Sequence, residues 1–357
     1  MRVLAVNAGS SSLKLSVVDE HDRVEAAEQL EADGDHVGAL RAFITKVGPV
    51  GAVAHRLVHG GPYVRRATSV TDDVRRQLDV AAALAPLHVP PALALLDAAR
   101  RLTSAAEVVC VDTAFHASLP ESATTYAIPQ QWRELGIRRY GFHGLSYAWA
   151  SRRSAELLDR APAELQLVIA HIGSGVSVCA TRAGRSVDTS MGFTPLEGAV
   201  MASRSGTVDP GALLWLQQAQ GVSPEELSDA IEHRSGLLAL CGASDMREVE
   251  RRTHMGDPPF VAALDVYIHA LCRNIGAVAA SLDRVDALVF TGGVGEGSAL
   301  VRSRVCARLQ LLGVPDGLAA PGGDAVIAPA SSGPAVIVVT AREDAEMARE
   351  ARRLLAP

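Results

Sequence analysis

Three stretches of the chain carry side chains that could bind an anionic substrate. Arg56 stands near the end of an apolar run, residues 50–58, just before Gly60 and Gly61. A guanidinium stays charged at working pH and can bind carboxylate or phosphate oxygens through two parallel hydrogen bonds. Asp112 ends a second apolar run, and His143 lies between glycines. Arg56 alone is equally compatible with an ion pair at the surface, and Asp112 and His143 alone are more often ordinary turn residues. The number of such residues is stronger evidence for a functional site.

Small residues gather where backbone N–H groups could approach a phosphate. NAGSSSLK (residues 7–14), HIGSG (171–175) and GGVGEG (292–297) each follow an apolar run. Small side chains let the backbone bind an anion closely, and serine hydroxyls and a lysine add donors. No stretch fits the GxxxxGK[ST] or GxGxxG pattern, so each of them could also be an ordinary Ser/Gly turn that binds no ligand. Lys14 is one of two lysines among 34 basic residues, which favours a functional role.

These candidate residues are positioned by alternating strands and helices, the pattern of an α/β protein. A long loop rich in Gly and Pro, residues 192–210, carries Arg204 and has the length of a functional loop. Strands are expected at residues 3–7, 13–19, 50–58, 107–112, 166–171, 175–181, 185–189, 286–291 and 335–340. Helices are expected at 72–85 and 91–103, through most of 210–282, and at the C-terminal end.

A weak internal repeat links the two halves. Residues 4–10 (LAVNAGS) resemble residues 168–174 (VIAHIGS), with His171 in the place of Asn7. In both places an apolar strand runs into a small-residue turn and then into another strand. A repeat of this length predicts two similar domains and not a solenoid, which agrees with 357 residues at ~100–200 per domain.

Composition excludes several classes of protein. The chain is 48% hydrophobic and 21% charged with a net charge of −6, which argues against disorder, coiled coil and attraction to nucleic acid or anionic membranes. Five scattered cysteines, without CxxC or zinc spacing, predict buried free thiols in a reducing compartment. No apolar run is expected to approach the ~18–20 residues of a membrane helix. We therefore expect a cytoplasmic protein with no membrane or nucleic-acid partner.

An ordered series of motifs resembles the acetate kinase family (acetate, propionate and butyrate kinases). In succession the chain carries NAGSSSLK, HRLVHGG, APLH, VDTAFH, RRYGFHG, HIGSG, SVDTSMGFTPLEG, SRSGTVDP, SDMREVE and FTGGVGEGS. Single motifs are weak, but their order is specific and spans residues 3 to about 350. The resemblance implies two duplicated actin-like α/β domains around a nucleotide cleft, residues 1–116 plus 345–357 and residues 117–344. It also implies a homodimer that reversibly transfers the ATP γ-phosphate to a short carboxylate with Mg²⁺ or Mn²⁺.

Matching motifs also imply residue roles. Arg56 and Arg204 would bind the carboxylate and stabilise the transferring phosphoryl group, which His143 would hydrogen-bond and Asp112 would position. Asn7 and Glu343 would place the metal ion. The acyl group would lie among Val58, Leu87, Phe142 and Pro195. The nucleotide would contact Ser12, Lys14, His171, Gly173, Ser174, Gly175, Asp245, Met246, Arg247, Gly293, Val294 and Gly295.

The chemistry of phosphoryl transfer agrees with these roles. A carboxylate is already an adequate nucleophile, so the site must supply alignment and neutralising charge and needs no general base. The chain departs from the usual family pattern on the nucleotide side, where Ser174 and Gly297 replace asparagines and Ala202-Ser203 replaces Gly-Thr. Open alternatives are a kinase for propionate or another short acid, a different phosphoryl donor, and a non-catalytic nucleotide-binding protein.

Overall fold

The computed structural model describes residues 1–9, 12–31, 34–85, 89–315, 322–330 and 333–356, which form two compact units. The first unit contains residues 1–117, 142–149 and 342–357, and the second contains 118–141 and 150–341. Compared with the boundaries expected from the sequence, the first unit also includes Ala117, Phe142–Trp149 and residues 342–344.

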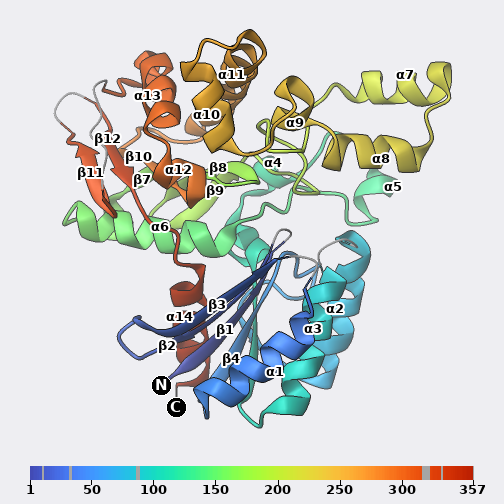
Figure 1. Ribbon diagram of the computed structural model, residues 1–357, viewed down its shortest axis with the longest axis vertical. Helices are drawn as coiled ribbons and strands as arrows, with labels where there is room; N and C mark the ends of the chain where they lie inside the picture. Colours follow the sequence, from blue (N-terminus) through green and yellow to red (C-terminus); the bar gives the residue numbers. More distant parts are fainter. Residues whose placement is uncertain (10–11, 32–33, 86–88, 316–321, 331–332, 357) are drawn as a thin grey trace. The chain divides into compact units, whose positions relative to one another are not determined.

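The first unit is built on a six-stranded sheet in the order β3-β2-β1-β4-β6-β5 (Figure 1). Its strands are β1 (Val3–Ala8), β2 (Ser12–Val18), β3 (Val24–Glu31), β4 (Ala52–Leu57), β5 (Thr68–Ser69) and β6 (Ala106–Val111). The central strands β1, β4 and β6 run parallel, whereas β2, β3 and β5 pair antiparallel with their neighbours. The carboxyl ends of the central strands therefore lie at one edge of the sheet.

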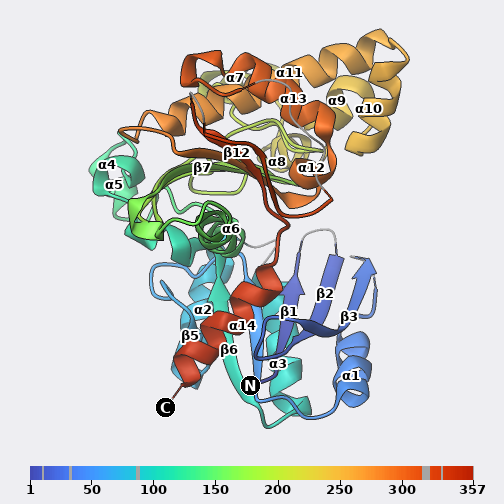
Figure 2. The same cartoon turned by 90° about the vertical axis from the view of Figure 1, so that its left-hand side faces the viewer.

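Helices cover both faces of this sheet (Figure 2). They are α1 (His36–Val47), α2 (Asp72–Leu84), α3 (Val89–Leu102) and α14 (Glu343–Leu355). Side chains of a strand point alternately to opposite faces, and accordingly Val3 and Ala5 of β1 pack against α14 while Leu4 and Val6 pack against α1 and α3. Both faces of the central strands are buried, which explains why these strands are continuous apolar runs.

The second unit repeats the same sheet, in the order β9-β8-β7-β10-β12-β11. Its strands are β7 (Gln166–Ile172), β8 (Val176–Arg182), β9 (Arg185–Thr189), β10 (Ala287–Thr291), β11 (Ala325–Ala328) and β12 (Ala335–Val338). Each pairing runs in the same direction as its counterpart in the first unit. His171 lies on β7 where Asn7 lies on β1. The expected duplicated α/β fold is confirmed.

Most helices of the second unit lie between β9 and β11. They are α7 (Pro210–Gln220), α8 (Pro224–His233), α9 (Gly236–Cys241), α10 (Met246–His254), α11 (Pro258–Ala279), α12 (Gly292–Gly297) and α13 (Ala299–Arg308). Earlier in the chain come α4 (Glu121–Thr124), α5 (Gln130–Arg133) and α6 (Gly144–Leu157), of which α6 begins in the first unit.

Helix α11 corrects one expectation. It is 22 residues long and apolar enough to span a membrane by length and composition, although no apolar run was expected to come close. One face of α11, including Leu264, Ile268 and Leu271, is buried in the core of the second unit. Asp265 and Arg273 interrupt the run. Packing against the sheet and neighbouring helices accounts for this apolar sequence.

Several elements escaped prediction from sequence. Strand β3, helix α1 and strand β11 lie in segments to which no element was assigned, and α6 was not expected to begin directly after His143. All five cysteines are free, as predicted, but Cys241 and Cys272 are only half-buried.

Candidate active site

The first unit brings Asn7, Arg56 and Asp112 together at the carboxyl ends of adjacent strands. In β1 and β4, Val3, Ala5, Ala52 and Ala54 face helix α14. Side chains alternate along a strand, so Asn7 and Arg56 also project toward α14, whose first residue is Glu343. Asp112 directly follows β6, the strand paired with β4. The sheet and one helix N-terminus thus assemble four residues that are far apart in sequence.

Arg56 is the centre of this group. Its Nε and Nη2 donate to the two carboxylate oxygens of Asp112 at 3.1 and 2.7 Å, and its Nη1 donates to the Asn7 side-chain oxygen at 3.0 Å. The Asn7 amide donates to Glu343 at 2.6 Å, and Glu343 lies 3.8 Å from Arg56 Nη1. A guanidinium has five N–H groups, so two of them have no acceptor among the residues that the structure describes. The bonds to Asp112 and Asn7 fix the plane of the guanidinium.

The charged side chains around Arg56 are largely shielded from solvent, and this burial shifts their pKa values. The Asp112 side chain has no exposed surface, and that of Arg56 is 11% exposed. Burial disfavours the charged guanidinium, but Asp112 and Glu343 outweigh it and raise the pKa of Arg56. Burial also raises the pKa of Asp112. Arg56 and the backbone N–H of His143 oppose this rise, because they donate hydrogen bonds to the charged carboxylate. Arg56 is therefore a permanent cation beside two carboxylates.

His143 is held next to Asp112 by an unusual backbone. Its φ of 58° lies in the left-handed region, which residues other than glycine rarely adopt. The next residue must be glycine, because a Cβ at Gly144 would lie 1.9 Å from the backbone oxygen of Asp112. The close approach of these two segments places His143 beside the Arg56 group. Strained backbone of this kind is concentrated at functional sites.

Of the four residues expected around an acyl group, the structure describes two in the first unit. Val58 directly follows β4 and is half-buried, and Phe142 is buried and makes an edge contact with the ring of His59 at 5.8 Å. Leu87 lies outside the described residues. Pro195 belongs to the second unit, where its carbonyl oxygen accepts a hydrogen bond from Arg204 at 2.7 Å.

The long loop that carries Arg204 is ordered by hydrogen bonds within the second unit. Glu197 accepts hydrogen bonds from Tyr126 at 2.5 Å and from Arg139 at 2.8 Å. The Ser205 backbone N–H donates to Ile231 of α8 at 2.9 Å. Burial lowers the pKa of Arg204, an effect that Glu232 partly offsets. The loop thus holds a half-buried cation ready for an anion.

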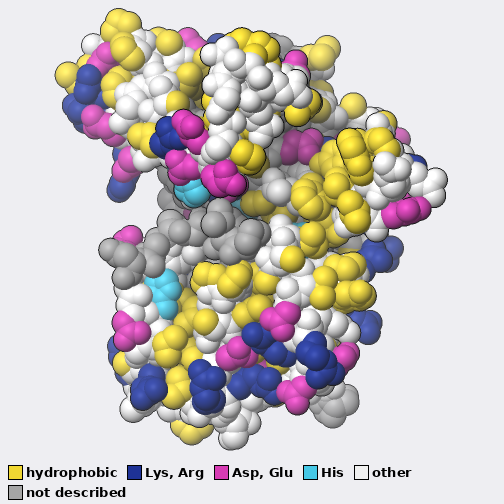
Figure 3. All heavy atoms as spheres, turned by 90° about the vertical axis from the view of Figure 1, so that its right-hand side faces the viewer, with side chains coloured by type: hydrophobic (Ala, Val, Ile, Leu, Met, Phe, Trp, Pro, Cys, Tyr) yellow, Lys and Arg dark blue, Asp and Glu magenta, His cyan; other side chains and the backbone are white. Residues whose placement is uncertain are grey.

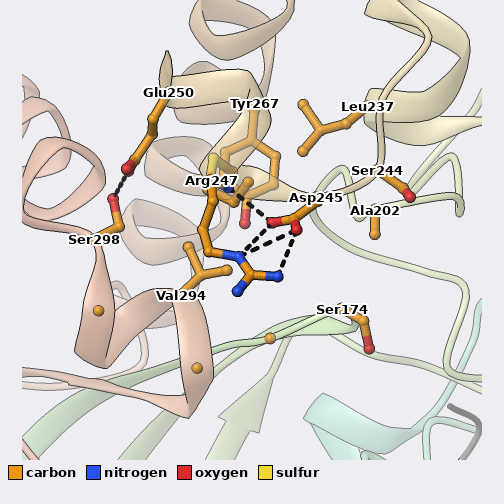
Figure 4. Close-up of a pocket in the computed structure, with 14 residues that line it drawn as sticks. Ser174, Ala202, Leu237, Ser244, Asp245, Arg247, Glu250, Tyr267, Val294 and Ser298 are labelled. Atoms are coloured by element: carbon orange, nitrogen blue, oxygen red, sulfur yellow. Dashed lines mark hydrogen bonds and ion pairs between the residues drawn. The ribbon is translucent and has the colours of Figure 1, made fainter. Parts of the chain in front are cut away.

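A cavity of about 530 Å³ opens in the second unit (Figure 4). Its lining is formed by the β7–β8 hairpin, the start of α9, the start of α10, the middle of α11 and the turn after β10. The lining residues are Gly173, Ser174, Ala202, Leu237, Ser244, Asp245, Met246, Arg247, Glu250, Tyr267, Gly293, Val294, Gly297 and Ser298. A pocket of this size suits a nucleotide or a molecule of similar size.

Seven of the twelve residues expected to contact a nucleotide line this cavity. They are Gly173, Ser174, Asp245, Met246, Arg247, Gly293 and Val294. His171, Gly175 and Gly295 are near in sequence but are not part of the lining. Ser12 and Lys14 lie on β2 in the first unit, and Lys14 is exposed. The cavity therefore gathers most of the predicted set but not all of it.

At the mouth of the cavity, Arg247 pairs with its neighbour Asp245. The Arg247 Nη2 donates to the Asp245 carboxylate at 2.7 Å (Figure 4). Asp245 also caps α10 by accepting from the Arg247 backbone N–H at 2.9 Å. The hydrogen bonds from Arg247 lower the pKa of Asp245. The cavity therefore carries both a fixed anion and a fixed cation at its edge.

A residue that was not expected from the sequence, Arg302, holds part of the cavity lining in place. Arg302 of α13 is buried, and its Nη1 donates to the carbonyl oxygens of Gly295 and Glu296 at 2.8 and 2.6 Å. These two oxygens end helix α12. Gly292 begins α12 with a φ of 79°, and a Cβ there would lie 2.9 Å from the Ile172 carbonyl oxygen. Arg302 and the close packing of Gly292 thus fix the turn that presents Gly293 and Val294.

Comparisons with known proteins agree with this arrangement. The family model of the Acetokinase family matches residues 39–349. Acetate kinase of Streptomyces coelicolor is 41% identical, with 99% of this chain and 97% of that protein covered. The crystal structure of Porphyromonas gingivalis acetate kinase has a TM-score of 0.88 at 32% identity and covers 99% of both chains. A propionate kinase structure from Francisella tularensis has a TM-score of 0.89 at 29% identity, covering 98% of both. With a matching family model and full-length relatives, the chain belongs to the acetokinase family.

Proposed function

We propose that this chain reversibly transfers the γ-phosphate of ATP to acetate, forming acetyl phosphate and ADP. The observation that carries the proposal is the buried Arg56, held by Asp112 and Asn7 with two N–H groups left for a substrate. Full-length similarity to acetate kinases supports the same reaction. In the transfer, a carboxylate oxygen forms a bond to the γ-phosphorus while the bond to the β-phosphate oxygen breaks, and no proton has to move.

Charge and alignment explain how these residues would act. Arg56 and Arg204 would bind the carboxylate and neutralise charge on the transferring phosphoryl group, which is the main requirement of such a transition state. His143, held beside Asp112 by its backbone, would donate a hydrogen bond to that group. Asp112 would act as a positioning residue, because two of its hydrogen bonds orient Arg56. Val58 and Phe142 would surround the acyl methyl group.

The donors around Arg56 fit a magnesium ion that arrives with a nucleotide. Among the residues that the structure describes, no three His, Cys, Asp or Glu side chains form a metal cage. Mg²⁺ is usually bound by one or two carboxylates together with substrate phosphates and water, and Glu343 with the Asn7 amide offers oxygen donors of this kind. Asp112 and Glu343 place two acidic side chains beside Arg56. When bound, the ion would neutralise charge on the phosphate oxygens.

The cavity of the second unit would take the nucleotide. Ser174 and Gly293 would offer backbone N–H groups without bulky side chains, as phosphate binding requires, while Gly173 uses its own N–H to bond the Gly175 carbonyl oxygen at 2.9 Å. Leu237, Met246 and Val294 offer apolar surface for a base. We place the protein in the cytoplasm, which its free cysteines support.

The direct test is acyl phosphate formation with ATP and Mg²⁺ across formate, acetate, propionate and butyrate, with hydroxylamine trapping the product. A maximum at acetate is expected, and Arg204→Gln should lose most of kcat. Arg185→Gln, which removes an exposed arginine on β9, is the matched control and should keep wild-type turnover. A maximum at propionate would instead favour the activity named for the Francisella tularensis structure. No product from any acid would contradict the proposal.

We also propose that the protein is a homodimer in which α7 and α8 form the interface. Neither helix buries any side chain, and Leu214 and Trp215 of α7 are more than half exposed. Trp132 and Leu135, near α5, are likewise exposed. Viewed from the side on which α7 and α8 lie in Figure 1, hydrophobic side chains gather on the second unit (Figure 3). Exposed apolar clusters of this kind mark interaction sites.

Sedimentation measurements test the interface. Trp215→Glu is expected to shift a dimer to monomer, since it places a charge in an apolar contact. Leu311→Glu changes another strongly exposed apolar residue of the second unit, outside these helices, and should leave the dimer intact. A monomeric wild-type protein, or a dimer unaffected by Trp215→Glu, would contradict this interface.

A further inference from the structure

Tyr267 has a buried hydroxyl without a hydrogen-bond partner in the described part of the chain. The residue lies on α11 and is 1% exposed. Its hydroxyl has no hydrogen-bond partner among the residues that the structure describes. Buried hydroxyls normally have a partner, because leaving one unpaired is costly. This hydroxyl is therefore an exception that needs an explanation.

The position of Tyr267 supplies one. The side chain lines the cavity of the second unit, and in Figure 4 it extends from α11 into the space between Leu237, Arg247 and Val294. Burial raises the pKa of Tyr267, so the phenol stays neutral and keeps its proton for donation. The residue that bears the unpaired hydroxyl thus lines the place where a ligand would bind.

The rest of the lining indicates which part of a nucleotide would lie there. Gly293, in the first turn of α12, offers backbone without a side chain for phosphates. Leu237, Met246 and Val294 are apolar, and the first two are largely buried. A flat, weakly polar base suits that apolar end, and base nitrogens are hydrogen-bond acceptors. Tyr267 belongs to the same lining and carries a hydroxyl donor.

We infer that the Tyr267 hydroxyl donates a hydrogen bond to the base of the bound nucleotide and so helps to select the phosphoryl donor. This inference rests on the proposed function, because it requires a nucleotide in this cavity. Tyr267 contacts the base of the nucleotide and takes no part in phosphoryl transfer. It should therefore affect affinity for ATP and leave kcat with saturating ATP unchanged.

Tyr267→Phe removes only the hydroxyl and is the variant that tests the inference. Loss of one neutral hydrogen bond predicts about a 3- to 10-fold rise in the Kd and KM for ATP. The Tm should be equal to wild type or higher, because a buried unpaired hydroxyl is removed. Inhibition by inorganic tripolyphosphate, which has no base, should be unchanged.

Thr181→Val is the matched control. Thr181 on β8 also has a buried hydroxyl without a partner among the described residues, but it does not line the cavity. Its substitution should leave the Kd for ATP unchanged. Equal ATP affinity of Tyr267→Phe and wild type would overturn the inference, as would an equal loss of affinity for tripolyphosphate. A wild-type protein that fails to bind ATP would contradict the proposed function itself, and the inference with it.

Discussion

Removing Arg56 should destabilise the first unit as well as abolish activity. Arg56→Ala deletes the partner of Asp112, whose carboxylate has no exposed surface and is bound by two hydrogen bonds from the guanidinium. Removing one partner of a buried ion pair leaves an uncompensated charge and costs about 3–5 kcal/mol. We expect a loss of this size in the free energy of unfolding, measured by urea denaturation.

A double-mutant cycle separates the pair from its surroundings. Arg56→Leu and Asp112→Leu should each destabilise the protein, whereas the double variant should be more stable than the sum of the two losses predicts, by at least about 2 kcal/mol. All three variants should lack acyl phosphate formation. Arg234→Ala, which removes an exposed partner of Asp229, is the control and should change stability by less than about 1 kcal/mol. Additive losses would refute the account of Arg56 and Asp112 as one buried unit.

Three further predictions concern other buried groups. Burial lowers the pKa of His59 from 6.5 to about 4, so below pH 6.5 the unfolded chain binds a proton that the folded protein does not. Stability should be complete above pH 6.5 and fall by about 3 kcal/mol by pH 4, and His59→Gln should flatten this dependence in pH-dependent denaturation. Arg302→Leu leaves two buried carbonyl oxygens without their donor and should raise the KM for ATP while destabilising by about 2 kcal/mol; an unchanged KM would contradict its role under the cavity. Gly144→Ala places a Cβ against the Asp112 backbone and should prevent normal folding, whereas Gly276→Ala in open space on α11 should stabilise by up to about 1 kcal/mol in thermal denaturation; comparable stability of the two variants would contradict the packing.

The central strands could be predicted because burial on both faces makes each of them a continuous run of apolar residues. Strands β1, β4, β6, β7 and β10 are short apolar runs, and each was expected close to its observed position. Strand β3 was missed because it is an edge strand whose side chains are mostly exposed, so its sequence is largely polar. Strand β11 lies within a Pro/Gly/Ser-rich stretch and is also at an edge. Edge strands lack the burial that makes central strands recognisable.

Part of the candidate site was predictable because its residues lie at the ends of recognisable strands. Arg56 and Asp112 could be singled out because they follow apolar runs that end at one edge of a parallel sheet. Glu343 could not be placed beside Asn7 by any local pattern, since 336 residues separate them and their contact depends on how α14 packs on the sheet. Tyr267 was missed because a tyrosine in an apolar helix looks like any core residue. Arg302 was missed because no helix was expected at residues 299–308 and an arginine is normally exposed.

Transfer of label from γ-³²P-ATP to acetate tests the central claim most directly. Purified protein with Mg²⁺ and acetate should produce labelled acetyl phosphate and ADP in equal amounts, and Arg204→Gln should produce almost none. Release of inorganic phosphate without acetyl phosphate from freshly quenched reactions, or no consumption of ATP at all, would contradict the assignment of this chain as a carboxylate kinase.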